Sequence, residues 1–316
     1  MKPKLCNFKK RERGRGAFPD SASLTLRVTI HGGSIVTFMN RVWMPVVVAG
    51  LWLGIVALVN SKETPALPDT AAPQSLTLEQ LCSGKLKIVD LTYTLNDKNP
   101  YWPGDNYQPF QLKTIATLEK NGVLSKAFYC PEHLGTHLDA PNHFELKQPA
   151  LHELPPENFF APGIVIDVSM QAETDPDYQL SERDIAEWEK KHGPIPTGAV
   201  IFLHTGWGRF WTNSERYKNQ DIMRKMHFPG YSPAAATLLI KGRSAKGLGI
   251  DTLSMDPGLS KDFQVHHIVN GAGRYGLENV ANLHELPPRG FYVTVAPIKI
   301  ESGSGGPTRI FAILPK

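Results

Sequence analysis

Cysteine is scarce in this sequence. Its 316 residues include three cysteines, Cys6, Cys82 and Cys130, an odd number without the paired spacing of a cysteine-based metal motif. This scarcity argues against the disulfide framework that stabilises many small secreted domains. Cys130 lies just before a histidine-rich segment, but a buried structural thiol fits it better than a nucleophile. Internal repeats are also lacking.

The signs of a nucleic-acid-binding protein are missing as well. No aromatic platform or known nucleic-acid-binding fold accompanies the basic run at residues 9–15. Residues 1–41 hold nine Lys or Arg against Glu12 and Asp20, a net charge of +7, so the rest of the chain carries 4 − 7 = −3. The basicity thus belongs to the tail, which we expect to be topogenic or disordered, and we expect no nucleic-acid partner.

A hydrophobic run follows the basic tail. Residues 42–59 are uncharged and mostly apolar, a length at the threshold for a membrane span and slightly long for a signal-peptide core. Basic residues before the run and few after it predict that the following domain is translocated. We therefore expect residues 42–60 to be an export signal or a membrane anchor, with a buried core helix as the alternative. Met39 is a second candidate start.

Residues 61–75 have the proline-rich, polar composition of a linker, so the folded domain is expected at 76–316. Strand-like runs occupy 86–94, 112–118, 125–130, 163–168, 199–204, 246–250, 291–296 and 309–314. Helix signals are fewer: a cap at Ser181 with an end at Gly193, a Ser232-Pro233 start before residues 234–241, and a segment at 263–270. This mixture predicts a single strand-rich α/β domain with a central mixed sheet and peripheral helices.

The densest chemistry lies at residues 131–144. His133, His137, Asp139 and His143 all occupy odd positions, so an extended chain would present them on one face. A straight strand would hold His133 and His137 about 13 Å apart, whereas metal ligands lie about 2 Å from their ion. The chain must therefore bend, and Gly135 allows a tight turn. Imidazole and carboxylate together suit Zn²⁺ or Mn²⁺.

The pattern His-x-Gly-Thr-His-x-Asp-Ala-Pro-x-His resembles the signature of the cyclase family of metal-dependent hydrolases, which includes kynurenine formamidases and isatin hydrolases. The resemblance runs from about Ile88 to Leu314 and includes the segments Trp102-Pro103-Gly104-Asp105, His204-Thr205-Gly206-Trp207, Gly249-Ile250-Asp251-Thr252 and Asp256-Pro257-Gly258. It implies a cyclase-like domain of the swivelling β/β/α type and a homo-oligomer.

A second part of the metal centre is expected far along the chain. Histidines near a helix end can simply favour the helix dipole, so the residues alone leave His266 and His267 undecided. The resemblance implies that His266 and Glu278 join His133, His137 and Asp139 as metal residues, and that His267 faces elsewhere. One or two ions are possible, because the two carboxylate oxygens of Asp139 could bridge.

Three further residues have candidate roles. A bound metal activates water and polarises a carbonyl, and an amide nitrogen leaves only when it is protonated. His143 suits the proton shuttle by its pKa near 6.5, a role that the resemblance also implies. Trp102 and Trp207 are candidates for an aromatic substrate pocket, with core packing as the alternative for each. His204 fits a structural role in a strand.

The sequence thus predicts a metal-dependent hydrolase that cleaves a C–N bond of a small aryl formamide or cyclic amide. A lyase or dehydratase using the same metal is the rival within enzymes. An exported binding protein without turnover is the rival from another class; the loss of His143 or of a ligand would favour it, and none is lost.

Overall fold

The computed structural model describes residues 76–316. The basic tail, the hydrophobic segment 42–60 and the linker 61–75 lie outside the described residues. Within 76–316, no helix combines the length and apolarity that a membrane crossing requires.

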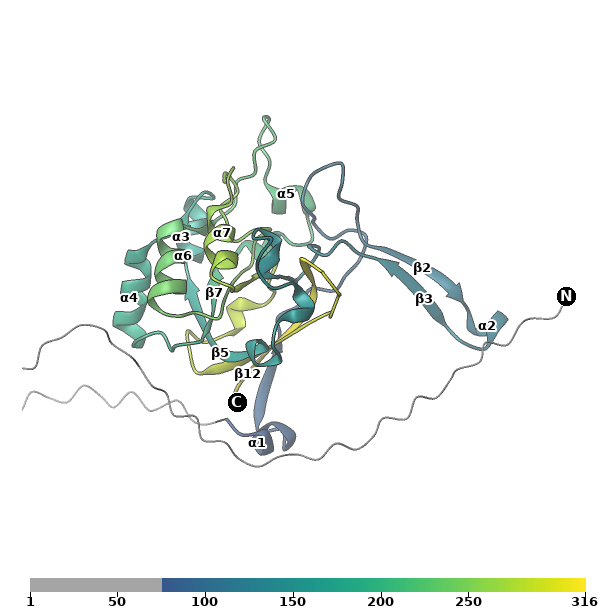
Figure 1. Cartoon of the computed structure of the whole chain (residues 1–316), viewed down its shortest axis with the longest axis horizontal. Helices are drawn as coiled ribbons and strands as arrows, with labels where there is room; N and C mark the ends of the chain where they lie inside the picture. Colours follow the sequence, from purple (N-terminus) through teal and green to yellow (C-terminus); the bar gives the residue numbers. More distant parts are fainter. Residues whose placement is uncertain (1–75) are drawn as a thin grey trace, which may run out of the picture. The chain divides into compact units, whose positions relative to one another are not determined.

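A mixed sheet of eight strands forms the centre of the domain (Figure 1). Its order is β1-β12-β11-β5-β7-β9-β10-β4. The neighbours from β5 to β10 run parallel and the other neighbours antiparallel. The strands are β1 (Leu86–Asp90), β4 (His137–Asp139), β5 (Phe160–Asp167), β7 (Val200–His204), β9 (Gly247–Ile250), β10 (Tyr275–Glu278), β11 (Phe291–Pro297) and β12 (Gly305–Pro315).

The sheet closes on itself through its shortest strand. β4 pairs with β10 on one side and with the start of β12 on the other, so the strands other than β1 form a ring. β1 pairs with the far end of β12. Because β4 pairs on both sides, neither β10 nor the start of β12 is left as a free sheet edge.

The strands β5, β7 and β9 are apolar on both faces because each face contacts a core. Val200 and Phe202 of β7 belong to the cluster inside the ring, while Ile201 and Leu203 belong to the cluster under the helices. Inside the ring, glycines make room for large rings: a Cβ at Gly249 would lie 2.5 Å from the Phe202 ring. Such alternation of small and large side chains fills a small barrel.

Helices cover one side of the sheet, as Figure 1 shows for α3 (Ser169–Thr174), α4 (Glu182–His192), α6 (Pro233–Thr237) and α7 (Gln264–Gly271). Ser181 caps α4 by accepting from the backbone N–H of Asp184, and Ser232 caps α6, which continues as the π-helical turn η5 (Leu238–Gly242). Shorter helices are α1 (Leu78–Cys82), α5 (Ser214–Lys218), η1 (Pro141–His143), η2 (Leu151–Glu153), η3 (Pro156–Phe159), η4 (Trp207–Phe210) and η6 (Leu283–Glu285).

A two-stranded ribbon extends away from the sheet in Figure 1. It consists of β2 (Gln111–Ala116) and β3 (Ser125–Tyr129), joined through α2 (Leu118–Asn121). Large apolar side chains along it, including Leu112, Ile115 and Phe128, are more than half exposed. β6 (Gln179–Leu180) and β8 (Gly230–Tyr231) form a second small pair.

The predicted fold class is confirmed: the domain is a mixed α/β unit with a central sheet and peripheral helices. Each of the strand-like runs contains a strand, and the three helix signals mark α4, α6 and α7. The sequence did not indicate β10, and where β4 lies it indicated only an extended chain next to a tight turn. β4 is three residues long and β10 reads Tyr-Gly-Leu-Glu, so neither is long enough to show a clear strand pattern.

Candidate active site

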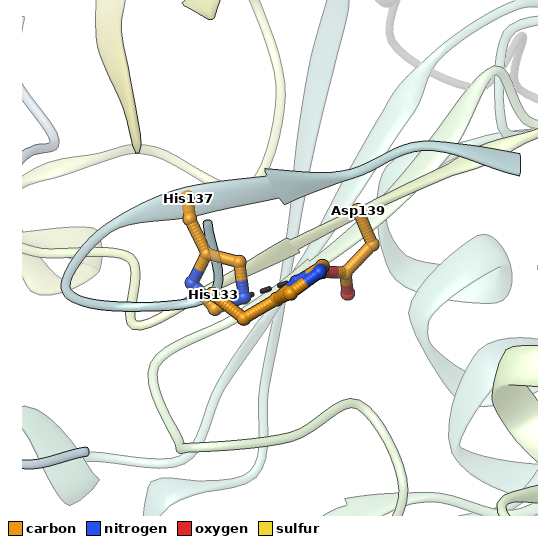
Figure 2. Close-up of side chains that lie close together, drawn as sticks. All are labelled: His133, His137 and Asp139. Carbon is orange, nitrogen blue, oxygen red and sulfur yellow. Dashed lines mark hydrogen bonds and ion pairs between the residues drawn. The ribbon is translucent and has the colours of Figure 1, made fainter. Parts of the chain in front are cut away.

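The histidine-rich segment folds as a tight turn that leads into β4. Gly135 has φ +68°, a left-handed conformation, and a Cβ there would lie 2.5 Å from Leu95 Cδ2. The turn brings His133 back beside the strand, so that its Nδ1 lies 2.6 Å from Asp139 Oδ1 (Figure 2). His137 Nε2 lies 3.2 Å from the same oxygen. The bend expected between His133 and His137 is therefore present.

Two more donors come from neighbouring elements. Glu278 ends β10 directly opposite His137 in the strand register, and its Oε2 lies 3.4 Å from His137 Nε2. His266 of α7 places Nε2 3.1 Å from Glu278 Oε1 and 3.5 Å from Asp139 Oδ2. The fold thus brings together all five residues that were expected at the metal centre.

Glycines on both neighbouring strands leave room around Asp139. Gly276 of β10 and Gly305 of β12 are its partners in the strand register. A Cβ at Gly276 would lie 2.4 Å from Met255 Cε and 3.0 Å from Asp139 Oδ2, and one at Gly305 would lie 2.5 Å from His133 Cε1. Side chains at either position would displace the donors.

The donors fit a divalent metal. They form two groups, His133 with His137 and Asp139, and Asp139 with His266 and Glu278. Donors on a tetrahedral ion, each about 2.0 Å from it, are roughly 3.3 Å apart, and four of the five donor pairs here are 3.1 to 3.5 Å apart. The fifth pair, His133 Nδ1 and Asp139 Oδ1, is hydrogen-bonded at 2.6 Å. Within the described residues, buried His137 Nε2 and Asp139 Oδ2 have no hydrogen-bond partner. Unpaired buried polar atoms are costly, and a cation would satisfy both.

Hydrogen bonds on the outer side orient two of the imidazoles. His137 Nδ1 lies 2.8 Å from the carbonyl oxygen of Gly135, so it donates, and Nε2 is the nitrogen that can bind an ion beside the carboxylates. His266 Nδ1 lies 2.6 Å from Asp256 Oδ2 in the same way. Carboxylate or carbonyl partners of this kind fix metal-binding histidines.

Asp256 is a functional residue that sequence reasoning did not single out. Its carboxylate also accepts the backbone N–H groups of Val265 and His266 at the start of α7. It therefore fixes both the helix and the ring that the helix carries. The available signal was the Asp256-Pro257-Gly258 segment, quoted above without a role for its aspartate.

The electrostatics of the cluster show how strongly these groups interact. Burial alone would lower the pKa of His137, but Asp139 and Glu278 raise it to about 10. Burial would raise the pKa of Asp139, yet the surrounding histidines hold it well below its usual range. Protons thus occupy the positions where a cation would bind, so metal binding must release protons.

His143 lies next to the donors without joining either group. Its ring stacks on His133 with centroids 3.8 Å apart, and its centroid is 5.8 Å from that of His266. Burial lowers the pKa of His143 to about 4; of its charged neighbours, Asp139 and Glu278 oppose this shift whereas His133 and His266 add to it. The imidazole is therefore neutral at neutral pH, and its pKa is lower than the value near 6.5 on which the predicted role rested.

A cavity of about 250 Å³ opens beside the cluster. Trp102 contributes to its wall, as expected, and its ring lies 5.8 Å from that of Phe263 between centroids. Sequence analysis did not single out the other apolar wall residues, because they lie in several segments that come together only in the fold. The lining consists of Trp102, Tyr107, His133, His143, Phe144, Leu253, Ser254, Phe263, His266, Glu278 and Asn279.

Trp207 is not among these lining residues, in contrast to its expected role in the pocket. Its indole is 3% exposed, packs with Trp211 and Tyr217, and donates Nε1–H to the carbonyl oxygen of Tyr217 at 2.8 Å. The structure therefore places Trp207 in the core, which was the alternative for this residue.

Three other residues are also outside the cluster. His204 pairs with Asp167, at 3.2 Å between Nδ1 and Oδ2, beside a different cavity. His267 faces away from the cluster toward Glu145, at 2.9 Å. Cys130 is half-buried, and burial raises its pKa to about 11, which does not suit a nucleophile.

Comparison with known proteins agrees with this geometry. The profile of the Cyclase family matches residues 89–257. An isatin hydrolase of Roseibium aggregatum is 30% identical over 252 residues, which cover 75% of this chain and 95% of that protein. A kynurenine formamidase of Geobacillus thermodenitrificans is 27% identical over 222 residues, covering 70% of this chain and 94% of that protein.

Solved structures give the same result. Isatin hydrolase A from Ralstonia solanacearum superimposes with a TM-score of 0.72 at 34% identity, over 77% of this chain and 100% of that one. An isatin hydrolase bound to the product analogue thioisatinate gives 0.72 at 29% identity, over 75% and 96%. The fold, the donor cluster and these matches together show that the chain belongs to the Cyclase family.

Proposed function

We propose that this chain is a metal-dependent hydrolase that cleaves the C–N bond of a small, uncharged aromatic amide, with cyclic amides preferred. The observation that carries the proposal is the cavity beside the donor cluster. Its outer wall is aromatic and aliphatic, and none of the described residues that line it is a lysine or an arginine. Flat apolar substrates match such walls.

The lack of lysine and arginine among the described lining residues bears on the choice between two substrates, those of kynurenine formamidases and of isatin hydrolases. N-formylkynurenine carries an ammonium and a carboxylate, whereas isatin carries no charge. Removing an ion from water costs several kcal/mol unless a partner compensates. None of the described residues that line the cavity gives a substrate carboxylate a lysine or arginine partner, so a zwitterionic substrate would lose affinity there.

We further propose that two divalent ions, Zn²⁺ or Mn²⁺, share Asp139. Each donor group supplies three protein donors, the number typical of a catalytic ion. The five residues do not form a single group with all donor atoms within 4.8 Å of one another. When bound, such ions polarise a carbonyl and activate water.

The residues around the cluster then have separate tasks. The aromatic wall holds the substrate ring and excludes water. Neutral His143 accepts a proton from the attacking water at its ring nitrogen and delivers it to the departing amide nitrogen, since it lies at the cavity beside His133 and His266.

Replacement of His143 tests this task. We expect His143→Ala to lower kcat by about 10²- to 10⁴-fold, the usual value of a positioned proton-transfer group, while metal content stays at the wild-type level. Elemental analysis and steady-state kinetics on the same samples measure both. The exposed His284 provides the matched control, His284→Ala, with unchanged kinetics. Metal loss in His143→Ala would make this residue a ligand.

The substrate proposal is tested with a panel of isatin, formanilide and N-formylkynurenine. We expect kcat/KM for N-formylkynurenine to be roughly 100-fold below that for isatin, which corresponds to about 2.7 kcal/mol. Mass spectrometry of the products must show the gain of one water. Equal kcat/KM values would refute the preference for uncharged substrates, and a product that has lost water or a fragment without hydrolysis would indicate a lyase.

A further inference from the structure

A glycine-rich segment at the start of β12, residues 303–306, packs against the start of the histidine-rich turn. It has the sequence Gly-Ser-Gly-Gly. Ser304 lies at its centre, with its Oγ 2.6 Å from Glu132 Oε2 and its backbone N–H donating to the same oxygen at 3.1 Å. His133 Nε2 lies 3.0 Å from Ser304 Oγ. These contacts connect a carboxylate, a hydroxyl and an imidazole in a row.

The direction of the hydrogen bonds in this row is fixed by chemistry. A carboxylate only accepts, so the Ser304 hydroxyl donates to Glu132. Its oxygen must then accept from His133 Nε2–H, which leaves Nδ1 as the ring nitrogen that can bind an ion. In this structure Nδ1–H donates to Asp139 Oδ1, 2.6 Å away, and an ion would replace that proton.

We propose that Glu132 and Ser304 select the tautomer and orientation of His133, and thereby determine how tightly the group of His133, His137 and Asp139 holds its ion. Neither residue lines the cavity, so both are positioning residues. The inference rests on the proposed metal centre. The partners of His137 and His266, a carbonyl and a carboxylate, accept only, whereas a hydroxyl can accept or donate. Ser304 therefore needs Glu132 as the acceptor of its hydroxyl hydrogen, so that the serine oxygen accepts from His133.

The backbone on either side of Ser304 lies close to both Glu132 and His133. A Cβ at Gly305 would lie 2.5 Å from His133 Cε1, and one at Gly303 would lie 3.0 Å from Glu132 Oε1. The carbonyl oxygen of Ser304 accepts from the backbone N–H of Ala140 at 2.8 Å, which ties the segment to the residue after β4. The two glycines thus let the serine approach both side chains closely.

Four variants separate tautomer selection from general packing. Ser304→Ala removes the acceptor for His133. Glu132→Ala frees the serine hydroxyl to donate to His133, and so permits the wrong tautomer. Glu132→Gln keeps a side-chain oxygen that can accept from Ser304. Ser302→Ala, in the same loop and with an exposed side chain, is the matched control.

The first measurement is metal affinity by competition with a chelator, using zinc alone as the probe and the full chain. We expect Ser304→Ala and Glu132→Ala to weaken one zinc equivalent by about 10- to 100-fold, with Glu132→Gln close to wild type and Ser302→Ala unchanged. Circular dichroism confirms that each variant is folded. Equal affinities in all four variants would overturn the inference, and so would equal losses in Glu132→Ala and Glu132→Gln.

The second measurement detects the proton directly. In zinc-loaded, ¹⁵N-labelled protein, the His133 Nε2–H should exchange slowly with water in the wild type and rapidly in Ser304→Ala. A proton on Nδ1, or unchanged exchange in the variant, would contradict the proposal. The two proposals fail separately: a wild-type chain that binds no zinc refutes the metal centre, whereas normal zinc binding by Ser304→Ala refutes only the role of the serine.

Discussion

Asp139→Ala is expected to lose all bound metal and to reduce turnover to background. Asp139 is the residue that the two donor groups share, since its Oδ1 faces His133 and His137 and its Oδ2 faces His266. Under the proposed sharing of Asp139, both ions would lose a ligand in one substitution. His137→Ala should also abolish turnover, because it removes a buried donor next to both Asp139 and Glu278. Elemental analysis and kcat measured on one preparation test both variants.

The control for this prediction is Asp97→Ala, which removes an exposed aspartate. It should keep full metal content and full activity. A thermal unfolding transition in Asp139→Ala must show that the variant is folded, since a denatured chain would also lose metal. Wild-type metal stoichiometry in folded Asp139→Ala would rule out its assignment as a ligand.

His266→Ala and Glu278→Gln form the second prediction with a large effect. Both residues belong to the second donor group and lie more than a hundred residues from the histidine-rich turn. We expect each substitution to remove one metal equivalent, or to weaken that equivalent by at least 10- to 100-fold. Glu278→Gln keeps the side-chain shape and removes the charge. Titration with a competing chelator gives the stoichiometry and the affinity together.

The neighbouring histidine supplies the matched control for this pair. His267→Ala should leave metal binding nearly unchanged, because its ring faces Glu145 and is 51% exposed. Small and equal effects in all three variants would leave a single ion bound by His133, His137 and Asp139. The proposal of a shared Asp139 would then be wrong.

The local part of the site could be predicted because its signals are local. The spacing of His133 and His137 requires a bend, and Gly135 between them supplies the left-handed residue that the bend needs. Strands β5, β7 and β9 were also predictable, since they are nearly continuous apolar runs buried on both faces.

Other parts of the site depend on contacts between residues that are far apart in the sequence, so no local pattern predicts them. The pairing of Glu278 with His137 is set by the register of two strands, one of which has three residues. Only the resemblance to a family suggested it. Trp102 and Trp207 looked equivalent as aromatic residues in loops, but one borders the cavity and the other packs in the core. Ser304 carries no pattern, because its role comes entirely from its approach to His133.

The closure of the ring through β4 has a consequence for the free energy of unfolding. β4 supplies His137 and Asp139 and is also the short strand that bridges β10 and β12. An ion held between β4, β10 and α7 therefore cross-links segments that are distant in the chain, as a disulfide would, although Cys82 and Cys130 in the described residues are free. A ligand that binds only the folded state adds about 2.7 kcal/mol at 100 times its Kd. When the metal is removed, the pairing of β4 with β10 and β12 should therefore open first. Amide hydrogen exchange should accelerate in β4 before it does in β5 or β7.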